Sequence, residues 1–299
     1  MRFAITACDS SLGVFNEFLK AGWEPVKLFS FSTQGSLDSN HKVTELAQSK
    51  RINVQLSRMT EADLRDLGES GCDVLIVAGY KWRIGDWRPY IKHAINFHPS
   101  PLPEARGPYP IVRAILENRK SWAVTCHQLA PDFDTGAILA AETFQLNDNE
   151  CHESMSLKTQ MASIRLAGRV ANDCVGLWNQ AKPQGPGDYW PKLTQEELTI
   201  NFSNSVDTIM RHVRALGLLE SLAYINGVLV CIRRAVGWTE MHSHVAGTVV
   251  HVNNKTIVVA TQDGYIGLID WNIISADLSN IFLGNIEGKL LSKSTGETG

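Results

Sequence analysis

The chain is predicted to be an α/β protein with a Rossmann-like, mostly parallel sheet, followed by a small all-β domain of the OB-like type. Three features of the sequence lead to this prediction. Short apolar runs alternate with helical patterns from residue 2 to residue 180. Residues 182–187 then interrupt the pattern with two prolines and two glycines, and short strands separated by turn sequences follow. Alternating strands and helices are typical of a sheet that is covered on both faces.

The elements of the first part are identified from their apolar periodicity. We expect strands at residues 2–7, 25–31, 53–56, 74–78, 94–97, 123–129 and 137–144. We expect helices at residues 11–20, 43–50, 62–67, 110–118 and 152–180. The ends of these strands should face one crevice.

The second part changes character after a predicted helix at residues 206–216. We expect strands at residues 222–225, 228–233, 247–252, 256–261 and 265–269. Asn226-Gly227, between the first two of them, is a strong hairpin signal. The predicted organisation is therefore a catalytic domain at residues 1–181, a linker at residues 182–204 and a β-rich domain at residues 205–299.

Composition limits the classes of partner. The 299 residues include 28 Lys and Arg against 31 Asp and Glu, a net charge of −3. This balance provides no general attraction to nucleic acid or to an anionic membrane. The six cysteines are scattered, the chain opens with a strand rather than a signal peptide, and no apolar run reaches the roughly 18 residues of a membrane span. We therefore expect a soluble, cytoplasmic protein.

Several common functional motifs are absent from the sequence. Residues 8–13, after the first strand, lack the glycine spacing of dinucleotide-binding folds. The sequence also lacks a Walker phosphate loop and a nucleophile elbow. His242 and His244 are two potential metal ligands without a third, so no metal site is expected.

Asn96, His98 and Asp134 form the most informative group of polar residues. Asn96 and His98 are two positions apart at the end of a strand, so both side chains should leave the same face. Asp134 lies in a turn before the next strand, where its carboxylate should reach His98 and raise the pKa of that imidazole. A protonated His98 and the Asn96 amide would stabilise an oxyanion. The alternative is that the Asn and His only hold a loop and that Asp134 caps a turn.

The stretch from Asn96 to Leu139 resembles the folate-dependent formyltransferases. Their signature is Asn-x-His, a Ser-x-Leu-Pro turn and a later Asp-x-Gly, and all three are present here. Arg106-Gly107 followed by Pro110, and Thr125-x-His127, match the order seen in the methionyl-tRNA and amino-sugar branches of the family. The likeness covers nearly the whole chain, with departures at Pro101 and Ala123.

The resemblance implies transfer of a formyl group from 10-formyltetrahydrofolate, used as co-substrate, to an amine, without a metal. Asn96, His98 and Asp134 match the catalytic trio of the family. The positions that match the folate pocket are Trp82, Arg83, Ile84, Ser100, Ala130, Pro131 and Asp132.

The acceptor is predicted to be a small amine, preferably a nucleotide-linked amino sugar. The tRNA-modifying branch carries a long basic loop after the second strand, whereas residues 32–40 contain no Lys or Arg here. A nucleic-acid partner is therefore not expected. Arg106, Tyr109 and Arg113 are candidates for binding the acceptor. Methionyl-tRNA and a hydroxyornithine-type siderophore precursor remain alternative acceptors. A hydrolase that acts without an acceptor remains an alternative activity, and a homodimer remains open.

Overall fold

The computed structural model describes residues 1–33, 39–225, 228–253 and 255–273. The chain divides into two compact units. The first comprises Met1–Pro110, Lys120–Leu146 and Ser156–Pro191. The second comprises Ile111–Arg119, Asn147–Met155 and the described residues from Lys192 onward. The first unit therefore extends beyond residue 181, the predicted end of the catalytic domain.

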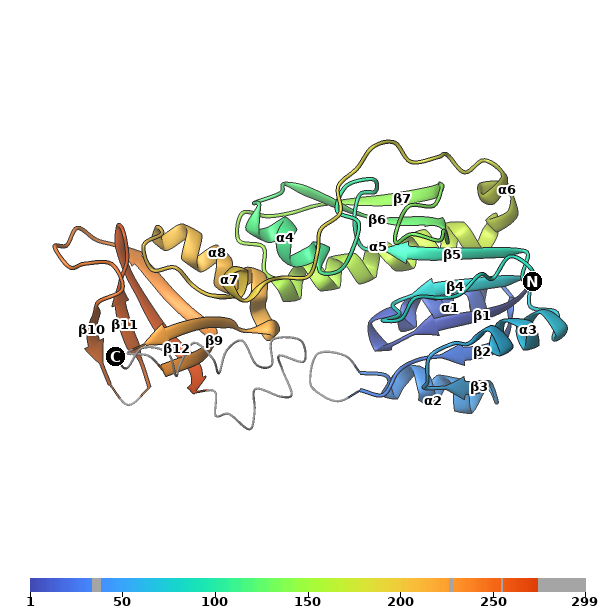
Figure 1. The fold of residues 1–299 in the computed structure, drawn as a ribbon, viewed down its shortest axis with the longest axis horizontal. Coiled ribbons are helices and arrows are strands. Elements are labelled where there is room, and N and C mark those ends of the chain that lie inside the picture. Colours follow the sequence, from blue (N-terminus) through green and yellow to red (C-terminus); the bar gives the residue numbers. More distant parts are fainter. Residues whose placement is uncertain (34–38, 226–227, 254, 274–299) are drawn as a thin grey trace, which may run out of the picture. The chain divides into compact units, whose positions relative to one another are not determined.

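A seven-stranded sheet forms the centre of the first unit (Figure 1). Its strands are β1 (Arg2–Ala7), β2 (Glu24–Phe29), β3 (Asn53–Gln55), β4 (Val74–Ala78), β5 (His93–His98), β6 (Ser121–Gln128) and β7 (Ile138–Gln145). They are ordered β3-β2-β1-β4-β5-β6-β7. β1 to β5 run parallel, whereas β6 is antiparallel to β5 and β7 is antiparallel to β6. The prediction of a mostly parallel sheet is confirmed.

Helices lie between these strands or follow them along the chain. They are η1 (Asp9–Ser11), α1 (Leu12–Lys20), α2 (His41–Ser49), α3 (Glu61–Glu69), α4 (Pro110–Leu116), α5 (His152–Asn172) and α6 (Cys174–Asn179). α3 illustrates how local hydrogen bonds set the residue at which a helix begins. Thr60 accepts a hydrogen bond from the Asp63 amide at 3.3 Å, and the Asp63 carboxylate accepts one from the Thr60 amide at 2.8 Å. This reciprocal pair satisfies donors that the first turn leaves free.

The prediction of one continuous helix at residues 152–180 is wrong at Asp173. The Asp173 backbone leaves the helical region, with φ −145° and ψ 48°, and its side chain accepts a hydrogen bond from the Gly176 amide at 3.1 Å. α5 therefore ends before Asp173, which caps the N-terminus of α6. A short polar side chain competes with helical hydrogen bonding in this way.

Alternate residues of the central strands enter two separate hydrophobic clusters. Phe3 and Ile5 of β1 belong to one cluster, and Ala4 between them belongs to the other. Successive side chains of a strand point to opposite faces, so both faces of the sheet are buried. This double burial explains the continuous apolar runs in the sequence.

The second unit contains an antiparallel sheet of five strands in the order β10-β11-β12-β9-β8 (Figure 1). They are β8 (Ser221–Ile225), β9 (Val228–Thr239), β10 (Val249–Val252), β11 (Ile257–Ala260) and β12 (Gly264–Ile273). The remaining helices are α7 (Gln195–Leu198), α8 (Val206–Leu216) and η2 (Gly217–Leu219). The β-rich character is confirmed. The predicted turn at Asn226-Gly227 lies outside the described residues, but its flanking strands β8 and β9 pair antiparallel.

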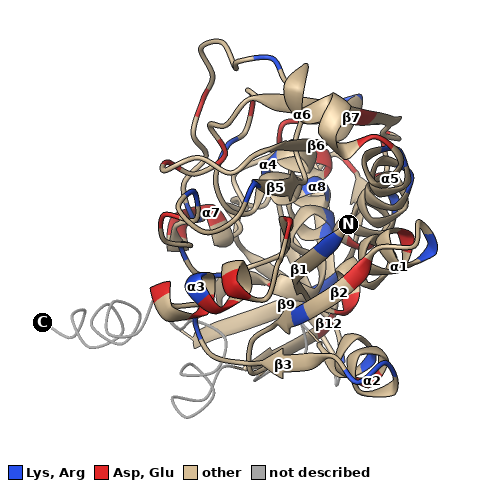
Figure 2. Ribbon diagram, turned by 90° about the vertical axis from the view of Figure 1, so that its right-hand side faces the viewer, with Lys and Arg blue, Asp and Glu red and all other residues tan. Residues whose placement is uncertain are grey.

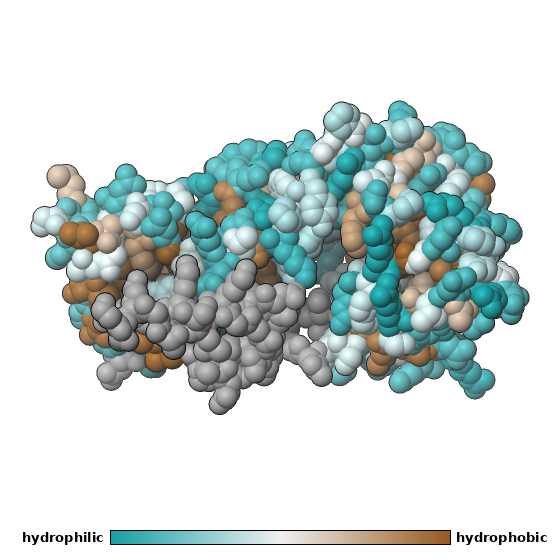
Figure 3. All heavy atoms as spheres, viewed as in Figure 1, coloured by the Kyte–Doolittle hydropathy of each residue, from teal (hydrophilic) through white to brown (hydrophobic). Residues whose placement is uncertain are grey.

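The surface of the described residues carries both signs of charge. Figure 2 shows acidic and basic residues mixed along α1, α3 and α5. On the face shown in Figure 3, the surface of the first unit is mainly hydrophilic. Among the described residues, no helix is both long enough and apolar enough to cross a bilayer.

Candidate active site

Strands β5 and β6 place three polar side chains beside one another. Asn96 and His98 belong to β5, and the antiparallel register sets Asn96 opposite His127 of β6. Asp134 follows in the loop that connects β6 to β7. The structure therefore brings the predicted Asn96, His98 and Asp134 together, and it adds His127.

The Asp134 carboxylate is the centre of this group. Its Oδ2 accepts a hydrogen bond from the Gly107 amide at 2.9 Å. Its Oδ1 accepts one from Asn96 Nδ2 at 3.2 Å and lies 3.4 Å from His98 Nδ1 and 3.6 Å from His127 Nε2. The side chains of both histidines and Asp134 are at most 10% exposed. Charge interactions in this group are thus screened little by water.

The hydrogen-bond partners indicate which ring nitrogens carry protons. His98 Nε2 lies 3.0 Å from the Ala105 carbonyl oxygen, so this nitrogen donates. His127 Nδ1 donates to the Gln128 carbonyl at 2.8 Å. His127 Nε2 is then free to accept a hydrogen bond from Asn96 Nδ2 at 3.1 Å. His98 Nδ1 faces the Asp134 carboxylate at 3.4 Å.

Burial controls the charge of His98. Burial lowers the pKa of His98 below its usual 6.5, although the negative charge of Asp134 and the Ala105 hydrogen bond act in the opposite direction. The expectation of a raised His98 pKa is therefore wrong. Burial raises the pKa of Asp134, but His127, the charge of His98 and the Gly107 amide outweigh it, so the net pKa of Asp134 is lowered. At neutral pH, Asp134 is charged and His98 is a neutral imidazole.

His127 was part of a recognised motif but was not predicted to belong to the site. Its position opposite Asn96 depends on the antiparallel pairing of β5 with β6. The sequence pattern identifies both strands, but it does not state which strands pair or in what register. The pairing is the signal that would have identified His127.

Two loops at the site adopt a left-handed backbone. Asp134 has φ 58°, and Ala105 and Gly107 have φ 56° and φ 100°. This conformation costs about 1–2 kcal/mol for a residue other than glycine. Ala105 supplies the carbonyl that holds His98, and Gly107 supplies the amide that holds Asp134. The loops that contain these left-handed residues thus orient His98 and Asp134.

A pocket of about 360 Å³ lies between the loop after β4 and the loop after β6. Four of the predicted folate residues line it: Arg83, Ile84, Ala130 and Pro131. The Arg83 guanidinium spans the two loops, because it donates to the Pro131 carbonyl and lies 3.5 Å from the Asp132 carboxylate.

The three remaining predicted folate residues, Trp82, Ser100 and Asp132, do not line this pocket. Trp82 packs against Tyr80, with ring centroids 5.2 Å apart, and under the Lys81 ammonium. Ser100 is fully buried, and its hydroxyl donates to the Glu104 carbonyl at 2.9 Å. Ser100 therefore shapes the loop after β5.

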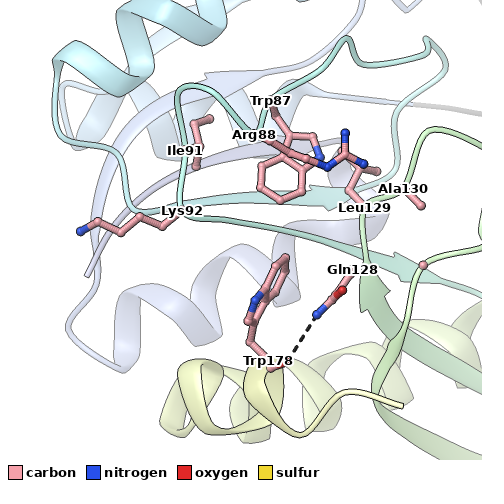
Figure 4. A pocket seen from close by; sticks show the side chains of 9 residues that line it. Trp87, Arg88, Ile91, Lys92, Gln128, Leu129, Ala130 and Trp178 are labelled. Carbon is pink, nitrogen blue, oxygen red and sulfur yellow. Dashed lines mark hydrogen bonds between the residues drawn. The ribbon is translucent and has the colours of Figure 1, made fainter. Parts of the chain in front are cut away.

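A second pocket, of about 420 Å³, adjoins the first (Figure 4). The two share Trp87, Arg88, Leu129 and Ala130. Trp178 of α6 stands opposite Trp87, with ring centroids 6.0 Å apart and planes at 82°. Gln128 Nε2 donates to the Trp178 carbonyl at 3.3 Å. The walls combine apolar side chains with Arg88 and Lys92, which form ion pairs with Asp86 and Asp73.

The proposed acceptor-binding residues have structural partners. Arg106 donates to Gln184 Oε1 at 2.8 and 3.1 Å. Arg113 forms an ion pair with Glu197. Tyr109 is 45% exposed. Arg106 therefore holds a loop, and Tyr109 is the candidate whose side chain reaches solvent.

Among the described residues, no group of three or more His, Cys, Asp or Glu side chains is arranged to hold a metal ion. His98, His127 and Asp134 share one hydrogen-bond network instead.

Two family profiles match this chain. One, described as formyl transferase, matches residues 31–169, and the other, the formyl transferase C-terminal domain, matches residues 192–276. A methionyl-tRNA formyltransferase of Orientia tsutsugamushi is 29% identical over 200 residues. That alignment covers 66% of this chain and 65% of the relative, so the chain spans slightly less than two thirds of the relative's length.

Solved structures share the fold at low sequence identity. HypX from Aquifex aeolicus matches with a TM-score of 0.68 and 18% identity, over 95% of this chain and 49% of that protein. An N-formyltransferase from Helicobacter canadensis, in complex with folinic acid and dTDP-3-aminofucose, matches with a TM-score of 0.64 and 16% identity. It is covered over 99% of its length, and this chain over 91%.

Proposed function

Because the chain belongs to the formyl transferase family, we propose that it moves the formyl group of 10-formyltetrahydrofolate to an amine of a small molecule, preferably a nucleotide-linked amino sugar. One observation carries the proposal. The buried Asp134 carboxylate lies within 3.4 Å of both the Asn96 amide and the His98 imidazole. An amide donor, an imidazole and a carboxylate are the groups that acyl transfer to an amine requires.

The co-substrate supplies an activated formyl carbon, which the acceptor nitrogen attacks. Asn96 Nδ2 donates to the formyl oxygen as negative charge develops there, and gives up one of its hydrogen bonds to Asp134 or His127. The neutral His98 accepts a proton that leaves the attacking nitrogen, and the Asp134 carboxylate stabilises the imidazolium that forms. The same pair returns a proton to the departing folate nitrogen. Catalytic contacts of this kind tighten when substrate binds.

The two adjoining pockets fit the co-substrate. Their apolar walls include Trp87, Leu129 and Trp178, and flat apolar walls suit a pterin ring. Arg88, which pairs with Asp86 at 2.7 Å, would exchange that partner for a carboxylate of the folate tail. The bound folinic acid of the Helicobacter canadensis neighbour supports this assignment. We propose Arg83, Ile84, Ala130, Pro131, Trp87 and Trp178 as folate contacts.

For the acceptor, the amino-sugar complex of the same neighbour supports a small amine. The described cysteines are all free, which fits a reducing cytoplasm. Methionyl-tRNA is the second candidate, because the curated relatives are methionyl-tRNA formyltransferases. Against it stand the net charge of −3 and the absence of Lys and Arg from residues 32–40.

The first test is an assay of 10-formyltetrahydrofolate consumption with UDP- and dTDP-amino sugars, hydroxyornithine and methionyl-tRNA as acceptors. Turnover that requires one of the small amines supports the proposal. Turnover that requires the charged tRNA selects the second candidate, and formate release without any acceptor identifies a hydrolase.

The second test asks whether the site performs the reaction. Asp134→Asn keeps the shape of the side chain but removes its charge, so kcat should fall by about a hundredfold or more. Asp66→Asn is the matched control, because Asp66 is exposed on α3, and it should turn over like the parent. An Asp134→Asn enzyme with a kcat within about threefold of the parent would refute the site.

A further inference from the structure

The segment from Lys182 to Trp190, termed here the strap, lies against both loops that orient the catalytic pair. Lys182 exchanges two backbone hydrogen bonds with Ile138 at the start of β7, at 2.8 and 2.9 Å. Further along, the strap pairs with the loop after β5, where Arg106 bridges Tyr189. All of these residues belong to the first unit. The first part of the predicted linker at residues 182–204 therefore packs against the loops that carry the site.

Gln184 of the strap holds the Asp134 turn. Its Nε2 donates to the carbonyl oxygens of Asp134 and Gly136 at 2.8 and 2.7 Å. Its Oε1 accepts from Arg106 Nε and Nη2 at 3.1 and 2.8 Å. The amide thus uses both hydrogens and both lone pairs. One carbonyl belongs to Asp134, the left-handed residue whose carboxylate enters the site, and the other lies two residues later.

Asp188 of the strap holds the second loop. Its Oδ1 accepts from the Ala105 amide at 3.3 Å, and its carbonyl accepts from the Arg106 amide at 3.1 Å. The other carboxylate oxygen accepts from the Trp190 indole at 2.6 Å. The loop that Asp188 holds supplies the Ala105 carbonyl to His98 and the Gly107 amide to Asp134.

The fit of the strap against this loop is close. A Cβ on Gly187 would lie 2.1 Å from the Pro103 carbonyl oxygen, and one on Gly107 would lie 2.5 Å from the Trp190 carbonyl oxygen. Real Cβ atoms do not approach backbone oxygens so closely, so both positions accept glycine alone. The strap and the loop are in backbone contact, which leaves little freedom for either.

We infer that Gln184 and Asp188 are positioning residues for formyl transfer, which hold Asp134 and His98 in register with each other. The inference rests on the proposed function. Neither side chain touches the reacting atoms. Each fixes a strained turn, and a displacement of about 1 Å at a catalytic group costs up to a hundredfold in rate.

Gln184→Glu is the sharpest test, because it changes one atom. The new carboxylate keeps the Arg106 contact, but it places an oxygen against the two carbonyl oxygens that the amide held. We expect kcat to fall about tenfold to a hundredfold, with the KM for 10-formyltetrahydrofolate within about threefold of the parent. Gln180→Glu makes the same chemical change at an exposed position just after α6, and should leave both constants unchanged.

A second readout needs no substrate. The charge of Asp134 raises the pKa of His98, so a displaced carboxylate should lower that pKa further. NMR titration of histidine-labelled protein measures it, with the His98 signal assigned from a His98→Gln sample. The titration uses the uncharged variants Gln184→Leu and Gln180→Leu, because a new carboxylate near His98 would itself raise the pKa. A lower His98 pKa in Gln184→Leu than in Gln180→Leu supports the inference. Equal titrations together with a Gln184→Glu kcat within about threefold of the parent overturn it.

Asp188→Asn replaces the Gln184 variants in both measurements if those do not fold. Asn is isosteric but loses the charge that attracts the Ala105 amide and the Trp190 indole. Its kcat should fall about threefold to tenfold, with the KM for 10-formyltetrahydrofolate unchanged. If the parent enzyme formylates no amine, the proposed function fails, whereas the His98 titration still decides the role of the strap.

Discussion

The Asn96 side chain uses both of its amide hydrogens before any substrate is present. One is donated to Asp134 Oδ1 and the other to His127 Nε2. The opposite orientation of the amide would point its oxygen at the carboxylate, so Asp134 fixes the flip of Asn96. His127 thereby helps to aim the donor that the developing oxyanion needs.

Removal of His127 tests this role at the level of one residue. In His127→Ala, Asn96 loses the ring nitrogen that orients one of its hydrogens, so we expect kcat to fall roughly tenfold to a hundredfold. The KM for 10-formyltetrahydrofolate should change little, because His127 lines neither pocket. Steady-state kinetics measures both constants. His41→Ala, at an exposed position of α2, is the control.

At the scale of elements, the loop from β6 to β7 carries the catalytic carboxylate. At Gly136 this loop lies so close to the end of β6 that no side chain fits. A Cβ on Gly136 would lie 1.8 Å from the Gln128 carbonyl oxygen. The loop must therefore pass directly over the end of β6. This close approach allows Asp134 to reach back to Asn96 and His98 on β5.

Two glycine substitutions compare a crowded position with an open one. Gly136→Ala should lower the free energy of unfolding by about 1–3 kcal/mol, because backbone must move to make room. Gly185→Ala, in the strap, places a new Cβ where no atom lies within 4 Å. This substitution should change the free energy of unfolding by less than about 0.5 kcal/mol. Urea unfolding measures both. Equal stabilities would contradict the close approach.

Elements are also the level at which the sequence is most informative. The sequence predicts all seven strands of the sheet, most clearly central strands such as β4, because strands buried on both faces are apolar throughout. The helix break at Asp173 was missed, since one polar residue hardly changes an apolar periodicity. Trp87 and Trp178 were also missed as pocket residues, because they come from segments far apart in the sequence.

At the scale of the whole molecule, the buried His98 and three half-buried histidines couple stability to pH. Burial lowers the pKa values of His93, His98, His152 and His212 below 6.5. The unfolded chain therefore binds more protons than the folded protein as the pH falls below about 7. These groups stabilise the folded state fully only while they are neutral.

We therefore expect the free energy of unfolding to decrease as the pH is lowered from 7 to 5. Above about pH 8 these histidines are neutral in both states and should contribute no slope. Urea unfolding at several pH values, followed by circular dichroism, measures the trend. Stability that rises from pH 7 to pH 5 would contradict the burial of neutral imidazoles. Two separate unfolding transitions would be consistent with this prediction, because the chain has two compact units.

The sequence by itself determined the α/β class, the β-rich second part and the three side chains Asn96, His98 and Asp134, because strand periodicity and motif spacing are local properties. The tertiary structure decided that His127 joins them, that burial leaves His98 neutral and that Gln184 and Asp188 hold the loops. Each of these depends on which distant segments pair and how much water they exclude. Local spacing carries no information about either, since burial and long-range hydrogen bonds exist only once the strands have found their neighbours.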